Sequence, residues 1–312
     1  MYLFSNILGV FIFDEKFNVV DKVLFNSLED YKNKDKFIEQ IKNQHKNLQE
    51  PNEEIIRKIL LHFKNKQFFD DFYKKNLELT KIDLKNSVSN DILLMQALNS
   101  VEEIGKSINL LIKRLREWYE LYNPEFSRAT ESHERFVKEI LEYEKIELLK
   151  KLGVKIDESM GADFKQEDLE PIRSLTHQIY NLYQLKKAQI EYISNLMDDF
   201  CPNIKAVCEV LVGAKLIEQA GSLKRLSEMP ASTIQILGAE KALFRHMKTG
   251  AKPPKHGIIV NHPLIAKASD KMHGKIARAL SDKISIAAKI DYFKGKFIGD
   301  KLRKGLEDKF GQ

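Results

Sequence analysis

Hydrophobic residues form two short runs at the start of the chain and then change their period. The runs LFSNILGVFIF and VVDKVLF lie within residues 1–26 on either side of the turn-like segment DEKFN, a pattern typical of a β-hairpin. We expect a small α+β domain to continue from there to about residue 90. From Asp91 the apolar positions recur every three or four residues with Lys and Glu on the other face, which predicts a long amphipathic helix ending near Pro124.

The middle of the chain shows two further helical patterns. Residues 130–152 are rich in Glu, Lys and Leu without Pro or Gly, and residues 169–199 follow after a polar tip, GVKIDESMGADFKQED. The second pattern has a 3-4 seam with Lys186 and Gln189 at two polar positions; its apolar members are Ile172, Leu175, Ile179, Leu182, Ile193 and Leu196. We expect a long antiparallel coiled coil of these two helices joined by a flexible tip, with the remaining apolar edge facing a second copy of the chain. A helical hairpin folded back on its own domain is the alternative.

From Cys201 onward the pattern is helical but interrupted. Apolar helical stretches are separated by breakers, which predicts a compact domain of short helices; the breakers are Gly221, Pro230, Gly238, Gly250 and the Pro253-Pro254 pair. With 312 residues the chain exceeds the usual size of one hydrophobic core, so two or three modules are expected.

Charge is unevenly distributed between these modules. The net charge of +6 combines +11 in residues 201–312 with −5 in residues 1–200. Between Lys241 and Lys296 there are 13 basic and 3 acidic residues, a field suited to phosphates, although a solvated lysine-rich surface would look the same. No apolar run is long enough to span a bilayer and no signal peptide is apparent, so we expect a soluble, cytoplasmic protein without membrane contact. Two cysteines in such a chain are expected to be free thiols.

One stretch, ILGAEKALFRHMKTGAKPPKHGIIV at residues 236–260, concentrates the candidate chemistry. Gly238-Ala239 precedes a short helix and would leave free N–H groups at its start, where an anion can bind. Lys241 and Arg245 follow one helical turn apart on the same face. The neighbouring Leu243 and Phe244 are expected to be core residues. Together these features indicate a site for an RNA-sized anion.

Enzymatic readings of the same region are weaker. Gly238-Ala239-Glu240-Lys241 lacks the glycines and the Lys-Ser/Thr pair of a P-loop and places an acid where the phosphate would lie. His246, His256, His262 and His273 follow no common metal-ligand spacing, and the sequence contains no Gly-x-Ser-x-Gly nucleophile motif. We therefore expect neither a catalytic residue nor a metal or other cofactor.

The C-terminal third resembles the Nop domain, specifically that of the archaeal core protein of box C/D ribonucleoproteins, a relative of the eukaryotic nucleolar Nop proteins. The resemblance lies in GAKLIEQAGSLKRLSEMPASTIQILGAEKALFRHM, PPKHGIIVNHPLI and KMHGKIARALSDKISIAAKIDYFKGKFIGDKL, and LREWYELYNPE at residues 115–125 looks like the family's entry into its coiled coil. Cys201 stands where alanine is more usual before Pro-Asn. The sequence stops at Gln312 without the long Lys/Glu-rich tail of eukaryotic members, and on this basis we expect the archaeal type.

The resemblance implies a mainly α-helical scaffold. Its parts would be a fibrillarin-binding α+β domain with the long helix at 1–123, a dimerising antiparallel coiled coil at 124–200 and a helical Nop domain at 201–312. The Nop domain would bind box C/D guide RNA already folded by a kink-turn-binding protein related to ribosomal protein L7, so that fibrillarin can methylate ribose 2′-hydroxyls. The resemblance implies that the residues contacting the RNA–protein complex are Gly238, Ala239, Glu240, Lys241 and Arg245. Lys275 and Arg278 would belong to the same binding site.

Two questions stay open at this point. Glu240 either favours the positive end of its helix or contacts the basic partner protein, with equal weight. A general RNA-binding protein without a methyltransferase partner would also explain the basic third, but it leaves the acidic N-terminal domain and the coiled coil without a role.

Overall fold

The chain consists of two compact units. The computed structural model describes residues 1–45 and 47–311 and divides the chain into Met1–Ser89 and Asn90–Gln312. The sequence had suggested a boundary at residue 123, with the long helix in the first domain. The structure instead groups that helix with the second unit, because Leu94, Leu98 and Val101 lie in one apolar core with the C-terminal helices.

The first unit is built on a three-stranded antiparallel sheet of order β1-β2-β3, comprising β1 (Tyr2–Asn6), β2 (Gly9–Phe13) and β3 (Val19–Leu24). The predicted turn at residues 14–18 joins β2 to β3. The sequence missed a second turn inside the first apolar run, at Ile7 and Leu8. Asn6 Oδ1 accepts the Leu8 N–H at 2.9 Å and closes this turn, while both apolar turn residues are buried and give no polar signal.

Helices cover both faces of this sheet. Phe11 and Phe13 of β2 pack with Phe63 on one face, towards α3 (Glu53–His62) and α4 (Lys66–Asn86). Val10 and Ile12, which alternate with them, pack on the other face with Ile41 of α2 (Lys34–Gln44), next to α1 (Leu28–Lys32). The two-residue period of the strand therefore divides its apolar side chains between two cores.

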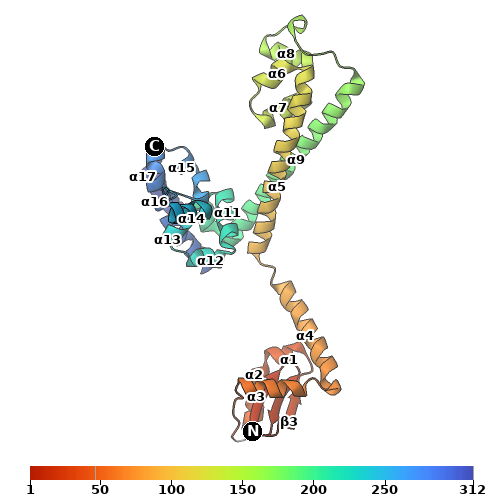
Figure 1. Cartoon of the computed structure of the whole chain (residues 1–312), viewed down its shortest axis with the longest axis vertical. Helices are drawn as coiled ribbons and strands as arrows, with labels where there is room; N and C mark the ends of the chain where they lie inside the picture. Colours follow the sequence, from red (N-terminus) through yellow and green to blue (C-terminus); the bar gives the residue numbers. More distant parts are fainter. Residues whose placement is uncertain (46, 312) are drawn as a thin grey trace. The chain divides into compact units, whose positions relative to one another are not determined.

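The second unit is organised around two long antiparallel helices, α5 (Asn90–Tyr122) and α9 (Gln166–Phe200), seen side by side in Figure 1. Leu94 at the start of α5 shares a core with Ile193, and Leu115 near its end shares another with Ile172. The expected long antiparallel helix pair is thus present, but one of its two helices differs from the prediction. α9 pairs with the helix at 90–122 and only secondarily with residues 130–152, because the stripe of α5 needs the seam of α9 to be buried.

Residues 124–165 form a cap on the far end of this pair, in α6 (Pro124–Ala129), α7 (His133–Glu142), α8 (Lys145–Leu152) and the 3-10 turn η1 (Ile156–Glu158). The single helix predicted at 130–152 breaks at Tyr143, where the backbone is extended and Glu144 begins α8. The tip predicted to be flexible is anchored instead. Ala162 N donates to Leu121 O at 2.9 Å, and Glu125 Oε1 accepts the Met160 N–H at 2.7 Å.

The C-terminal region is a set of short helices around one long one, as the breakers predicted. α16 contacts α10, α12, α13, α15 and α17. The elements are α10 (Pro202–Cys208), α11 (Val210–Ala220), α12 (Leu223–Glu228), α13 (Ala231–Ile236), α14 (Glu240–Thr249), η2 (Ile258–Asn261), α15 (Pro263–Ala266), α16 (Asp270–Tyr292) and α17 (Gly299–Phe310).

A buried carboxylate fixes this bundle to the end of α9. Asp291 of α16 accepts hydrogen bonds from Asn203 N, Asn203 Nδ2 and Ile204 N at 2.7–3.1 Å, and Asn203 Oδ1 accepts the Ile298 N–H at 2.7 Å. Cys201 and Cys208 are buried beside it as free thiols, and burial raises the pKa of both. Across residues 1–45 and 47–311, no helix has the length and apolar character needed to cross a membrane.

Candidate nucleic-acid interface

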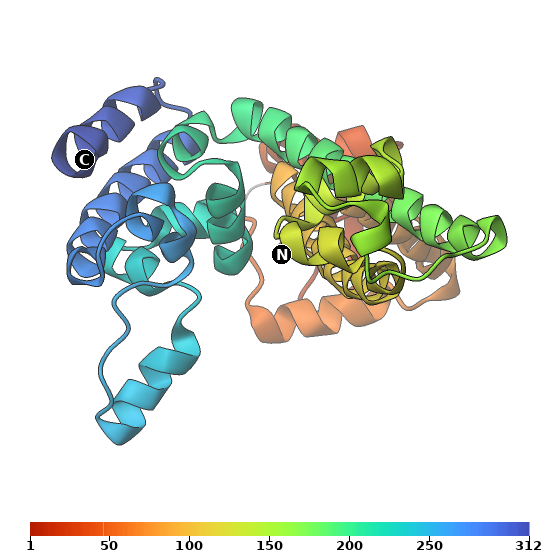
Figure 2. The ribbon, with the colours of Figure 1, turned by 90° about the horizontal axis from the view of Figure 1, so that it is seen from above.

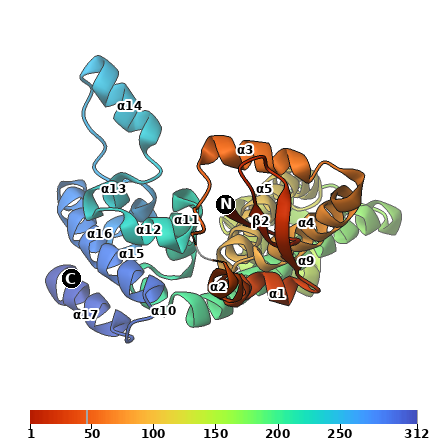
Figure 3. The same cartoon turned by 90° about the horizontal axis from the view of Figure 1, so that it is seen from below.

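The predicted site helix, α14, projects from the rest of the C-terminal helices. Figures 2 and 3 show it reaching away from α13 and α16 on two extended pieces of chain. None of its residues is buried, although its composition is amphipathic. A helix of ten residues has little stability of its own in water, so α14 depends on its attachment and on any ligand that it binds.

The base of α14 is a close crossing of two chain segments. Gly257 N donates to Gln235 O at 2.8 Å and Ile258 N donates to Leu237 O at 2.9 Å, so the incoming and returning chains are paired. A Cβ on Gly257 would lie 1.9 Å from Leu237 O, which leaves no room for any other residue. The crossing therefore sets the direction in which α14 leaves the domain.

Glu240 occupies the start of α14. Its Oε1 accepts the N–H of Gly238 at 2.7 Å and lies 3.5 Å from Gln219 Nε2. This geometry agrees with the first of the two roles left open for Glu240, a negative charge at the positive end of the helix. The expectation that the N–H groups of Gly238 and Ala239 are free for a phosphate is wrong, because that of Gly238 donates to Glu240 and that of Ala239 donates to Ile236 O at 2.8 Å.

Lys241 and Arg245 lie one turn apart on α14, and both are exposed. Within residues 1–45 and 47–311, neither has a carboxylate within ion-pair distance. The expectation that Phe244 packs in the core is wrong, because its side chain is 60% exposed. The side chain of Met247 is 71% exposed. Leu243 is half-buried. An isolated helix with free cations and exposed apolar side chains is a surface prepared for a partner.

Lys275 and Arg278 lie on α16 instead, three residues apart on an exposed face. The chain returning from α14 is tied to the start of this helix, because Lys255 Nζ donates to Asp270 O at 3.1 Å and the rings of His256 and His273 are 5.5 Å apart. Burial, and then the nearby His273 and Lys255, hold the pKa of His256 below its ordinary value. The region between α14 and α16 therefore keeps this histidine neutral at neutral pH.

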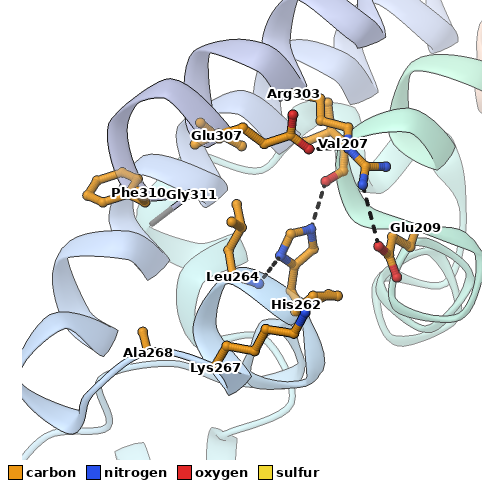
Figure 4. A pocket seen from close by; sticks show the side chains of 12 residues that line it. Val207, Glu209, His262, Leu264, Lys267, Ala268, Arg303, Glu307, Phe310 and Gly311 are labelled. Carbon is orange, nitrogen blue, oxygen red and sulfur yellow. Dashed lines mark hydrogen bonds and ion pairs between the residues drawn. The ribbon is translucent and has the colours of Figure 1, made fainter.

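A hollow of about 320 Å³ lies elsewhere in the same bundle, between α10, α15 and α17 (Figure 4). Arg303 in this hollow is held by Glu307 at 2.7 Å and Glu209 at 3.7 Å, so its charge is largely neutralised. His262 is buried there; its Nδ1 accepts the Leu264 N–H and its Nε2 donates to Val207 O. This hollow is therefore less suited to an anion than α14. No group of three or more potential metal-ligand side chains occurs among the residues that the structure describes.

Comparison with known proteins relates this architecture to one family. Residues 100–312 match the Nop family, described as "snoRNA binding domain, fibrillarin". A NOP5 family protein of Methanocaldococcus jannaschii is 42% identical over 80% of this chain and 64% of its own length. Nucleolar protein 56 of Caenorhabditis elegans is 35% identical over 70% of this chain and 50% of its own, and nucleolar protein 58 of Aspergillus terreus is 37% identical over 64% and 37%.

Among solved structures, a chain of a crystallised fibrillarin/Nop5p complex aligns over 99% of this chain and 98% of its own at 22% identity, with a TM-score of 0.45.

The chain spans between about a third and two thirds of the length of the NOP5 family protein and of nucleolar proteins 56 and 58 named above. The match over residues 100–312 includes α14, α16 and most of α5, so the candidate interface lies inside the part of the chain that matches the family. This chain belongs to the Nop family, whose members include archaeal NOP5 proteins and the eukaryotic nucleolar proteins 56 and 58.

Proposed function

We propose that this protein is a non-catalytic scaffold of a box C/D ribonucleoprotein. It would link the methyltransferase fibrillarin to guide RNA carrying a kink-turn protein related to ribosomal protein L7, for RNA-guided 2′-O-ribose methylation. The observation that carries the proposal is α14, an unpacked helix inside the Nop domain. Its Lys241 and Arg245 are exposed and form no ion pair with any residue that the structure describes. Such cations can bind phosphates without first breaking contacts within the protein.

The limited charge of this helix agrees with binding to RNA and kink-turn protein together instead of to RNA alone. Lys241, Arg245 and Lys248 supply three positive charges and Glu240 removes one. Few phosphate contacts give weak, salt-sensitive binding to RNA alone. The exposed Phe244 and Met247 offer apolar area to a protein that is already bound to the RNA, which would raise the affinity for the complex.

The first unit offers a separate surface for fibrillarin. Phe69, Tyr73 and Leu77 recur every four residues on α4 and are 44–59% exposed, and the rings of Phe69 and Tyr73 stack at 6.3 Å. A row of two exposed aromatic side chains and an exposed leucine is typical of a protein interface and supports a partner at this unit. We place fibrillarin on this row.

The long helix pair supports the proposed homodimer. Leu110 and Leu121 of α5 are 68% and 61% exposed and lie three turns apart on one face of the helix. A second copy that covered both would extend the intramolecular pairing of α5 and α9.

In this proposal the chain acts as a scaffold because one part of it holds the enzyme and another holds the guide RNA. The covalent link between the two parts raises the local concentration of enzyme at the target ribose. We propose a cytoplasmic location for this assembly.

Reconstitution tests the proposal. Methyl transfer would be measured with guide RNA, kink-turn protein, fibrillarin and S-adenosylmethionine, with the full chain, with residues 1–89 and 90–312 added as separate fragments, or without either. We expect activity only with the intact chain. Methyl transfer by the chain without fibrillarin, or full activity from the separated fragments, would overturn the scaffold role. If the chain binds RNA tightly but does not bind fibrillarin or support its methyl transfer, the alternative of a general RNA-binding protein would be favoured.

A further inference from the structure

α16 carries a continuous exposed row along its whole length. Its buried side packs on five neighbouring helices, and its outer positions recur every three or four residues, so they lie on one face. The members of this row, all exposed, are Lys271, Lys275, Arg278, Asp282, Ile286 and Lys289, followed by Phe293 at the C-cap of the helix. At about 1.5 Å per residue the row extends over roughly 33 Å. Only its first part coincides with the predicted site residues.

The far end of this row runs into a loop that alternates aromatic and basic side chains. Residues 293–297 read FKGKF, and the Phe293 and Phe297 side chains are 75% and 52% exposed. Lys294 and Lys296 lie between them and are exposed as well. In the part of the chain that the structure describes, no lysine or arginine of the row or loop has a carboxylate partner.

We propose that the outer face of α16 and the loop at 293–297 form a second RNA contact, which binds an unpaired segment of RNA with its bases stacked on Phe293 and Phe297. The inference rests on the proposed RNA-binding function. Lys275 and Arg278 hold the backbone near α14, Lys289 continues the path, and Lys294 and Lys296 bind phosphates beside the stacked bases. The strand therefore follows α16 from the kink-turn end to the loop.

Two features favour RNA over an acidic protein. The cations are spaced along a line instead of gathered in one patch, as a phosphate backbone requires, and Asp282 is the one acidic member of the row. At the end of that line the two aromatic rings flank Lys294 and Lys296. This combination is found in sites that bind single strands, where cations track the phosphates while rings stack the bases. An apolar protein patch would instead be depleted of lysine.

The test compares two RNAs that differ only in unpaired nucleotides. One is a short box C/D RNA that contains the kink turn with blunt ends, and the other carries ten unpaired uridines at each end; both are first bound to the kink-turn protein. The full wild-type chain should bind the tailed RNA more tightly. The double variant Phe293→Leu/Phe297→Leu keeps apolar side chains but removes the rings. It should lose about tenfold or more in affinity for the tailed RNA and nothing for the blunt RNA.

Matched variants separate the lysines from general charge. Lys289→Ala/Lys296→Ala should reduce the salt dependence of tailed-RNA binding, by roughly 1.4 in the slope of log affinity against log salt. Lys301 and Lys304 on α17 are also exposed and have no ion pair among the described residues, so Lys301→Ala/Lys304→Ala should leave the salt dependence unchanged. Phe293→Tyr/Phe297→Tyr should restore the affinity, because the ring faces return.

The possible failures are distinguishable. If wild type binds tailed and blunt RNA equally, the second contact is refuted while the proposed function stands. If it binds neither RNA complex, the proposed function fails as well. If the leucine variant loses affinity for the kink-turn protein in the absence of RNA, the rings belong to a protein interface and the inference is overturned.

Discussion

Gly238 and Ile258 cross at the base of α14, so that a Cβ on Gly238 would lie only 2.6 Å from Ile258 Cγ1. Gly238 also has φ +85°, a left-handed conformation that other residues adopt only at a cost. Gly250 ends the same helix at φ +70°, but a Cβ there would meet no atom within 4 Å in the described chain, apart from its neighbours in sequence and its own helix backbone. The two glycines share the backbone requirement and differ in the space around them.

This pair provides a controlled test of how α14 is held. Gly238→Ala should weaken binding to the RNA–kink-turn complex by at least tenfold, because the clash turns α14 away from its direction. Gly250→Ala carries only the backbone cost, about 1–2 kcal/mol confined to the helix end, and should have a much smaller effect on binding. Both variants should unfold near the wild-type temperature, since α14 buries no residue. Equal loss of binding in the two would show that the crossing does not position the helix.

Lys241 and Arg245 are expected to contribute directly to assembly. Each alanine substitution should cost roughly 1–3 kcal/mol of binding free energy if the phosphate contacts are desolvated, without loss of folding stability. Titration of the RNA–kink-turn complex at moderate salt measures the effect. Lys301→Ala/Lys304→Ala serves as the control, because it removes the same charge from α17. Unchanged affinity in the Lys241→Ala/Arg245→Ala variant would exclude α14 as the primary site.

Periodicity predicted the elements better than it predicted their partners. The stripe from Leu94 to Tyr122 and the seam through Ile172, Ile179 and Ile193 both exist, and the glycine breakers fall at helix ends. What the pattern could not state was that these two helices pack on each other. The apolar stripes of different helices look alike in sequence, so they do not show which helix packs on which. That α9 packs on α5 and not mainly on residues 130–152 depends on the break at Tyr143 and on the hydrogen bond from the tip to Glu125.

The candidate site shows the same limit. Lys241 and Arg245 could be placed on one face of a helix, but composition could not reveal that the helix is unpacked, so Phe244 was assigned to the core. Exposure of an apolar side chain depends on what the rest of the chain covers. Glu240 was ambiguous for a similar reason, since its bond to the Gly238 N–H requires the turn at Gly238 to be known. The sequence predicted Lys275 and Arg278 as site residues, but it did not predict that the exposed row of α16 continues from them to Phe293.

His262 gives the C-terminal bundle a predictable response to acid. Burial, the main cause, holds the pKa of its imidazole below the ordinary value, and protonated Nδ1 could no longer accept the Leu264 N–H. The unfolded chain takes up this proton near pH 6.5 and the folded chain only at lower pH, so the free energy of unfolding should fall as pH drops below about 6.5.

The matched variant is His262→Asn, which can still cap α15 but does not titrate. At neutral pH it should be about 1 kcal/mol less stable than wild type, because the bond to Val207 O is lost. Between pH 6.5 and 5 its stability should fall less steeply than that of wild type. His256 contributes in the same direction, so His256→Asn/His262→Asn should show the shallowest slope. Parallel slopes in denaturant titrations of wild type and His262→Asn would contradict the assignment.

Leu110 and Leu121 should mediate self-association of the long helix pair. On α5 they flank the ion pair of Arg114 and Glu117, whose N···O distance is 2.6 Å. If a second α5 runs antiparallel across this face, each Leu110 approaches the partner's Leu121, and the arrangement repeats by two-fold symmetry. Leu110→Lys/Leu121→Lys should then give a monomer by light scattering at micromolar concentration, with its helix content unchanged, because both side chains are exposed in the single chain.

Ile179→Lys provides the contrast. Ile179 is fully buried between α9 and its neighbours, so an unpaired charge there should destabilise the helix pair by several kcal/mol whatever the oligomeric state. If Leu110→Lys/Leu121→Lys gives a folded monomer and Ile179→Lys unfolds the helix pair, the dimer interface lies on the exposed face of α5. A wild-type chain that is already monomeric at these concentrations would refute the dimer. A surface variant that remains dimeric would move the interface away from α5.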